Sequence, residues 1–116
     1  MKSNKEICGK RHYGHYKSSA KRRNYCFELT YDQFTNLTEQ PCFYCGDTFS
    51  KVFKKNSACE AYLVNGLDRI NNKVGYIPDN VVSCCKWCNT AKLDMDVDDY
   101  IRKIKQVAAF MVEMDF

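Results

Sequence analysis

The sequence contains no apolar run approaching the ~20 residues that a membrane-spanning helix needs. No apolar segment of the kind found in secretory signals follows the first residue, and the chain opens instead with basic residues such as Lys5, Lys10 and Arg11. Internal repeats and low-complexity segments are also absent. These absences predict a protein of the cytoplasm or nucleus that is not secreted, has no membrane partner and keeps its thiols reduced.

Histidine is scarce as well: the chain has two, His12 and His15. Imidazole titrates near neutral pH and is the side chain most often used as a general base, so this chemistry has few candidates here. Both histidines lie in a basic N-terminal segment, where contact with phosphate is an alternative role.

Cysteine, in contrast, is abundant, with eight residues in 116. Cys42 and Cys45 form one Cys-x-x-Cys pair, and Cys85 and Cys88 form a second. Two such pairs are typical of a structural tetrahedral Zn²⁺ site, because each pair closes a tight turn around one edge of the metal; a redox motif and disulfides are the competing interpretations. The other cysteines are scattered and are expected to be buried or free thiols: Cys8, Cys26, Cys59 and Cys84.

The length predicts one compact domain whose modest core gains stability from a metal. The net charge is +4, and basic residues gather early in the chain while Asp94, Asp96, Asp98 and Asp99 gather late. The basic part predicts a phosphate-rich partner. The residues expected to contact nucleic acid are Lys17, Lys21, Arg22 and Arg23.

Local patterns predict an α+β fold. We expect helices over residues 11–24 and 31–38, the second with a Thr30/Gln33 capping box. Strands are expected over 61–70 and 80–83, with a turn-rich loop between them, and a helix from the second cysteine pair through Lys92. Tyr44 and Trp87, one inside each pair, are interpreted as packing residues.

The last segment predicts an amphipathic helix that starts at Asp96, with Asp98 and Asp99 in its first turn. Its apolar residues form one stripe, which we expect to face the core: Val97, Ile101, Ile104, Ala108 and Met111. The chain thus divides into a basic helical arm (1–40), a zinc-bound core (41–95) and a C-terminal helix (96–116).

Several motifs in one order resemble the HNH group of His-Me finger endonucleases, with their ββα-metal motif. They are Asp68-Arg69-Ile70, Gly75-Tyr76, Asp79-Asn80-Val81-Val82 and Cys85-x-x-Cys88-Asn89-x-x-Lys92, preceded by Pro41-Cys42-Phe43-Tyr44-Cys45-Gly46. The similarity covers most of residues 10–100. The Pro41–Gly46 segment and the Lys/Arg-rich arm before Phe27-Glu28-Leu29-Thr30 also resemble the small HNH proteins common in phages and other viruses. The resemblance implies a zinc-stapled ββα-metal domain and, for a viral protein, a host-cell cytoplasmic or nuclear setting.

The resemblance also implies roles for individual residues. Asp68 and Asn89 would bind a catalytic Mg²⁺ or Mn²⁺, and hard oxygen ligands suit such ions. Asn80 would support the loop between the strands, and Lys92 would contact phosphate or cap its helix.

The sequence departs from the family at Arg69, which stands where the family has the histidine that deprotonates water. Arginine stays protonated and cannot be that base. Either another group assists metal-bound water, or catalysis is lost, or the base lies elsewhere, at His12, His15 or Tyr76. For Arg69 itself a salt bridge to Asp68 or Asp79 and a clamp on the scissile phosphate stay open.

The sequence therefore predicts a metal-dependent DNA endonuclease that nicks one strand per encounter. The alternative is a catalytically inactive zinc module that binds nucleic acid or a protein partner, such as a viral regulatory factor. Whether the protein is a monomer or a dimer stays open.

Overall fold

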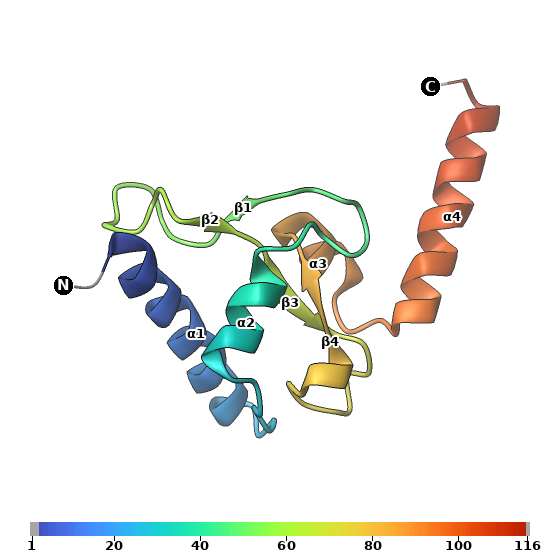
Figure 1. The fold of residues 1–116 in the computed structure, drawn as a ribbon. Helices are drawn as coiled ribbons and strands as arrows, with labels where there is room; N and C mark the ends of the chain where they lie inside the picture. Colours follow the sequence, from blue (N-terminus) through green and yellow to red (C-terminus); the bar gives the residue numbers. More distant parts are fainter. Residues whose placement is uncertain (1–2, 116) are drawn as a thin grey trace.

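The structure is a computed structural model that describes residues 3–115, so the outermost residues of the expected 1–40 and 96–116 segments lie outside it. Within the described residues the chain forms four α-helices, one 3₁₀ turn and two small two-stranded antiparallel sheets (Figure 1). The expected α+β class is confirmed.

Two helices form one side of the molecule. Helix α1 (Asn4–Arg22) begins earlier than expected because the Ser3 side chain accepts a hydrogen bond from the Glu6 backbone N–H and caps it. Helix α2 (Tyr31–Thr38) has the expected bounds and capping box, with Thr30 and Gln33 each accepting the other's backbone N–H.

The expected strand over 61–70 is divided at Asn65, which is fully buried. The Asn65 amide donates to the carbonyl oxygens of Gln40, Asp47 and Thr48 and so ties this point to the first cysteine pair. On one side of Asn65, β2 (Leu63–Val64) pairs with β1 (Ser50–Lys51); on the other side, β3 (Gly66–Arg69) pairs with β4 (Val81–Cys84). Tertiary hydrogen bonding therefore interrupts what local pattern presents as one strand.

Strand β3, a loop that ends in the 3₁₀ turn η1 (Pro78–Asn80), strand β4 and helix α3 (Lys86–Lys92) follow one another as a ββα unit. In the β3–β4 pair, Asp68 is opposite Val82 and Arg69 is opposite Val81. The second strand and the helix after it were predicted within a residue or two.

The main core lies between the first two helices and the ββα unit, and its buried members are Ala20, Leu29, Phe34, Leu67, Tyr76 and Val81. Tyr16 of α1 reaches β3, where its hydroxyl accepts a 2.9 Å hydrogen bond from the Leu67 backbone N–H. Burial raises the pKa of Tyr16 to about 12, although that hydrogen bond lowers it in part. Helix α1 is thereby held alongside the strand that carries Asp68.

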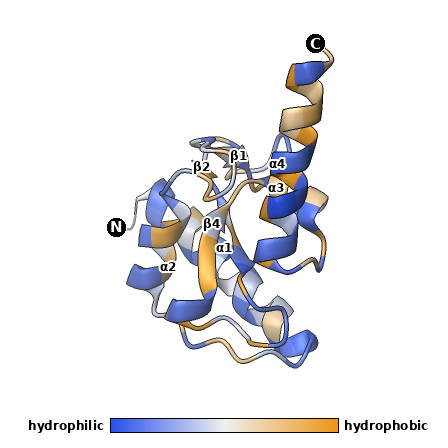
Figure 2. Ribbon diagram, turned by 90° about the vertical axis from the view of Figure 1, so that its right-hand side faces the viewer, coloured by the Kyte–Doolittle hydropathy of each residue, from blue (hydrophilic) through white to orange (hydrophobic). Residues whose placement is uncertain are grey.

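Helix α4 (Val97–Glu113) starts after Asp96 as predicted but projects away from the rest of the molecule (Figures 1 and 2). With α4 included, the extents of the molecule are 55 × 31 × 21 Å. Tyr100 is the one buried residue of α4. The expectation that its apolar stripe faces the core is wrong for most of the helix: Val97 and Ile101 are half-buried, but Ile104, Ala108 and Met111 are exposed. Amphipathic spacing indicates an apolar face but does not say what lies against it. No helix in residues 3–115 is long and apolar enough to cross a membrane.

Cys8 and Cys59 form a disulfide between α1 and the loop before β2, across a sequence separation of 51. The prediction of reduced thiols is therefore wrong for this pair, because the fold brings the two Cα atoms to 5.6 Å. Cys26 and Cys84 are free, and burial raises the pKa of the Cys84 thiol. Cysteine spacing alone did not indicate the pairing.

Candidate active site and zinc centre

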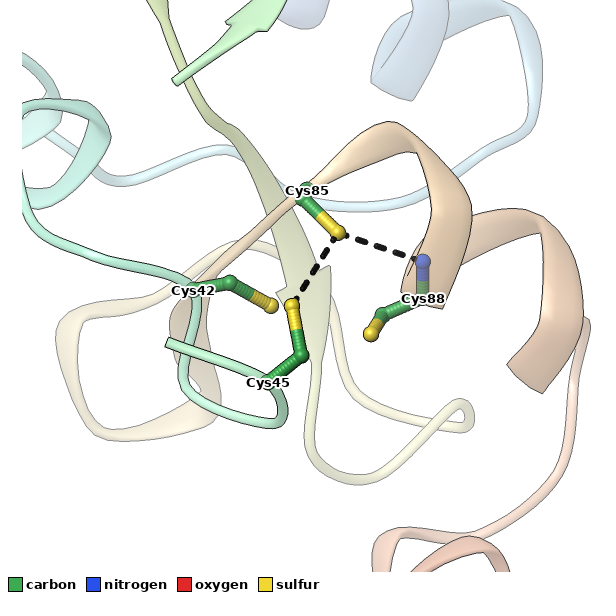
Figure 3. A group of neighbouring side chains, drawn as sticks. All are labelled: Cys42, Cys45, Cys85 and Cys88. Atoms are coloured by element: carbon green, nitrogen blue, oxygen red, sulfur yellow. Dashed lines mark hydrogen bonds between the residues drawn. The ribbon is translucent and has the colours of Figure 1, made fainter. Parts of the chain in front are cut away.

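The four cysteines of the two Cys-x-x-Cys pairs converge on one point (Figure 3). Cys42 and Cys45 come from the turn after α2, and Cys85 and Cys88 from the start of α3. Their sulfur atoms all lie within 4.8 Å of one another, with 3.6 Å between Cys45 and Cys85. Because a Zn–S bond is about 2.3 Å, tetrahedral zinc sets its sulfurs roughly 3.8 Å apart. The cluster can hold zinc as predicted.

At Cys42 the local backbone favours the thiolate form that zinc requires, whereas burial raises the pKa of the Cys88 thiol. Burial raises the pKa of the Cys42 thiol, but hydrogen bonds from the backbone N–H groups of Cys85, Cys45 and Tyr44 outweigh burial and bring that pKa down to about 7. The Cys88 backbone N–H also donates to Cys85 Sγ at 3.3 Å, which makes Cys85 the N-cap of α3. The metal centre and the start of α3 are thus one structure.

Asp68 on β3 and Asn89 on α3 line the same cleft, which has a volume of about 850 Å³. Arg69 lines it too, so the three predicted catalytic residues are brought together. The cleft residues are His15, Tyr16, Ser19, Arg22, Arg23, Leu67, Asp68, Arg69, Asn72, Tyr76, Asn89, Leu93 and Asp94. One wall comes from α1 and the other from the ββα unit.

Asp68 is 6% exposed and its carboxylate is held from two sides. Oδ2 accepts a 2.6 Å hydrogen bond from the Tyr44 hydroxyl and lies 3.2 Å from Lys92 Nζ. Oδ1 has one longer contact, 3.4 Å to the same ammonium. Oδ1 is therefore the carboxylate oxygen with more free coordination capacity.

Lys92 does not occupy the position expected for a phosphate contact. Its side chain is fully buried, with the ammonium between Asp68 and the Arg69 carbonyl oxygen. One turn of α3 separates Lys92 from Asn89, but Lys92 points into the protein because the buried carboxylate requires a compensating charge.

Asn89 is half-buried, and its side-chain amide has no hydrogen-bond partner among residues 3–115. A carboxylate oxygen and a free amide oxygen on one cleft are hard ligands of the kind that Mg²⁺ and Mn²⁺ bind. Two protein ligands would leave coordination positions for water and a phosphate oxygen. The donor set fits the expected ion.

Arg69 makes no ion pair with a carboxylate in the described part of the chain, so the salt-bridge interpretation is wrong. Its Nη1 donates to the Asn72 carbonyl oxygen at 2.6 Å and to that of Val74 at 3.3 Å. The guanidinium also lies 3.7 Å from the centre of the Tyr25 ring. These neutral partners fix the group at the cleft and leave its charge uncompensated.

Asn80 is buried and holds the loop between the two strands of the ββα unit. Its amide donates to the carbonyl oxygens of Asn71, Val74 and Gly75, and its Oδ1 accepts the Asn71 N–H. Since Val74 also accepts from Arg69, this network orients the guanidinium indirectly.

The three candidate bases differ in position. His15 is exposed on α1 and lines the cleft with Asp68 and Asn89. His12 is buried among aromatic rings, and burial together with the nearby His15 lowers its pKa to about 4. Tyr76 is buried at the cleft with its hydroxyl accepting from Arg23 Nη2 at 2.7 Å. His15 is the candidate that faces solvent within the cleft.

The predicted nucleic-acid contacts on α1 divide into two groups. Arg22 and Arg23 line the cleft beside Arg69, whereas Lys17 and Lys21 line a separate shallow groove next to Tyr25 and Phe27. None of these basic side chains is paired with a carboxylate within residues 3–115. Basic side chains without a carboxylate partner therefore lie both in the cleft and in the groove beside the end of α1.

Sequence reasoning missed one functional contact and misplaced another residue. Tyr44 was expected only to pack; it does pack, but it also donates to Asp68. Its position between the two cysteines of the first Cys-x-x-Cys pair was the available signal. Trp87 was also expected to pack, but it is 83% exposed on the surface of α3.

No protein-family profile matches the chain. It is 38% identical over 98 residues to an uncharacterised protein of Acanthamoeba polyphaga mimivirus, and 33% identical over 95 residues to an uncharacterised 29.0 kDa protein of Enterobacteria phage T4. These alignments cover 84% and 81% of this chain, but the chain spans only 16% and 36% of the relatives' lengths. Its curated relatives are thus viral proteins.

Among solved structures, the rare-cutting HNH restriction endonuclease PacI matches with a TM-score of 0.63 and 17% identity, covering 93% of this chain and 82% of PacI. The chain shares the fold of an HNH endonuclease. At this identity the comparison shows the fold alone, and the chemistry has to be argued from the cleft.

Proposed function

We propose that the protein is a divalent-metal-dependent endonuclease of the HNH type that hydrolyses a DNA phosphodiester and nicks one strand per encounter. The observation that carries the proposal is the cleft in which Asp68 and Asn89 face unpaired arginines and His15. Oxygen ligands for a hard cation and cationic groups for a phosphate occur together there. The fold shared with a restriction endonuclease supports DNA as the substrate.

In this proposal Asp68 and Asn89 hold Mg²⁺ or Mn²⁺, which when bound would polarise a phosphate oxygen. Arg69 donates its remaining N–H groups to the scissile phosphate and stabilises the charge that develops on it. Arg22 and Arg23 bind the neighbouring phosphates of the DNA backbone, and Lys17 and Lys21 extend the contact along the DNA strand. The zinc centre stabilises the fold and has no chemical role.

His15 is the proposed proton acceptor for the attacking water. It supplies the imidazole that the family has at the position of Arg69, but from α1 instead of β3. Because α1 is held to β3 through Tyr16 and Leu67, a base on the helix can keep a constant place relative to Asp68.

The alternative is a zinc module that binds nucleic acid without cutting it. The ion pair between Asp68 and buried Lys92 favours it, because an ammonium already compensates the carboxylate that would bind the metal. Three features of the cleft favour the enzyme: the Asn89 amide without a hydrogen-bond partner, the Arg69 guanidinium without a carboxylate partner, and His15.

Incubation of supercoiled plasmid with zinc-loaded protein tests whether the protein is the endonuclease or the zinc module that binds without cutting. We expect conversion to nicked circles with Mg²⁺ or Mn²⁺ and none without either ion, with Asn89→Ala strongly reduced. Thr90→Ala, an exposed neighbour on α3, is the matched control. Salt-sensitive DNA binding without nicking in any metal would contradict the enzyme and support the module.

Replacing His15 with alanine is expected to lower the nicking rate by about 10²- to 10⁴-fold, the usual contribution of a general base. Glu6→Gln, exposed on the same helix but outside both the cleft and the groove of Lys17 and Lys21, should leave the rate unchanged. A nicking rate in His15→Ala close to that of wild type would assign the proton to another group.

A further inference from the structure

The zinc centre and the proposed catalytic site meet at Tyr44. This residue lies between the zinc ligands Cys42 and Cys45, and its hydroxyl donates the 2.6 Å hydrogen bond to Asp68 Oδ2. The bond connects residues 24 positions apart in the sequence. It leads directly from the metal-bound turn to the carboxylate that we assign to Mg²⁺ or Mn²⁺.

The Tyr44 ring is held on its other sides. It packs edge-on against Tyr100 at 5.0 Å and against Phe43 at 5.2 Å between ring centres. The backbone of the turn is fixed to β4, since the Phe43 N–H donates to the Ser83 carbonyl oxygen at 2.8 Å. A hydroxyl on such a support has little freedom, so it restricts the rotation of the Asp68 carboxylate.

The same zinc centre also places the second ligand. Asn89 directly follows the zinc ligand Cys88 in α3, and its backbone N–H donates to the Cys85 carbonyl oxygen at 3.0 Å. One cysteine pair therefore acts on Asp68 through a side chain, and the other acts on Asn89 through the helix.

We propose that Tyr44 is a positioning residue through which the zinc-bound turn sets the affinity of the Asp68–Asn89 site for a divalent cation. The inference rests on the proposed function. Tyr44 occupies Oδ2 and leaves Oδ1, which has one longer contact, as the oxygen available to a cation. Without the hydroxyl, Lys92 is the sole partner of the carboxylate and can hold both oxygens, in direct competition with the cation. Outer partners of metal-ligating carboxylates typically contribute 10- to 100-fold to metal affinity.

Tyr44→Phe removes the hydroxyl and keeps the ring. Mn²⁺ binding to zinc-loaded protein, followed by electron paramagnetic resonance without DNA, should show a Kd raised by about 10-fold or more. Zinc content and melting temperature should stay near wild type. Tyr62→Phe, which removes a hydroxyl from a cluster remote from the cleft, is the matched control and should leave the Mn²⁺ Kd unchanged.

An Asp68→Asn/Lys92→Met variant separates this inference from the proposed function. If that variant loses Mn²⁺ binding while Tyr44→Phe binds as wild type does, the positioning role is wrong and the metal site stands. If wild type shows no site that depends on Asp68, the proposed function fails and the inference with it.

A measurement on the wild-type side chain covers the case in which Tyr44→Phe does not take up zinc. With tyrosine labelled at ¹³Cζ, one resonance should move as Mg²⁺ is added and should already be displaced in Asp68→Asn/Lys92→Met. A Mg²⁺ titration that moves no tyrosine resonance would overturn the role of Tyr44.

Discussion

Asp68→Asn is expected to lower metal-dependent nicking by on the order of 10³-fold or more, because it removes the charged ligand of the proposed cation and with it the stabilisation of the transition state. The isosteric amide leaves the shape of the cleft intact. DNA binding, which depends on the arginines and lysines, should change little.

The single substitution also leaves the Lys92 ammonium buried without its partner, which typically costs 3–5 kcal/mol, so a fall in stability of about that size should accompany the loss of activity. Asp68→Asn/Lys92→Met removes both charges and should recover most of the stability without any recovery of nicking. Loss of activity through misfolding and loss through chemistry are thereby separated by thermal denaturation and plasmid cleavage of the same variants.

The matched control is Asp79→Asn, which alters an exposed carboxylate on the loop that joins the same two strands. It should retain both stability and cleavage. Appreciable metal-dependent nicking by the well-folded double variant would exclude Asp68 as a catalytic metal ligand.

Removal of zinc is expected to unfold the ββα unit. Structural zinc contributes about 10–16 kcal/mol of apparent binding free energy in small zinc modules, whereas whole domains are stable by about 5–15 kcal/mol. Here the ion would join the turn after α2 to the start of α3, so its loss releases both Tyr44 and Asn89. A strong zinc chelator should abolish the cooperative thermal transition in circular dichroism.

Cys85→Ser should have the same effect, with zinc content below one ion per chain by elemental analysis. Cys26→Ser, at an exposed free cysteine, should keep full zinc content and the wild-type transition. A chelated protein that melts at the wild-type temperature would show that the cysteine cluster is not a structural metal site.

The apolar stripe of α4 was predicted from spacing, but the expectation that it faces the core was wrong for most of the helix. Ile104 and Met111 recur at helical intervals whether a helix covers a core or extends from it. The disulfide between Cys8 and Cys59 could not be predicted from the sequence either, since it depends on the approach of a helix to a distant loop.

Lys92 and His15 illustrate the same limit within the site. Lys92 belongs to a motif in which an exposed phosphate contact was expected, but the burial of Asp68 draws it inward. His15 belongs to no motif and was one of three candidate bases in the sequence; its place at the cleft depends on Tyr16, which holds α1 against β3.

The sequence by itself determined the elements whose signals are local: the two cysteine pairs, the capping box at Thr30, the start of α4 after Asp96, and the order of Asp68, Asn80 and Asn89 along a ββα unit. These follow from spacing and backbone capping, which act over a few residues. The tertiary structure alone decided that Tyr44 and Lys92 hold Asp68, that Arg69 is fixed by carbonyl oxygens, and that His15 faces the cleft. Those contacts join residues far apart in the chain, so burial and charge compensation in the folded protein select them.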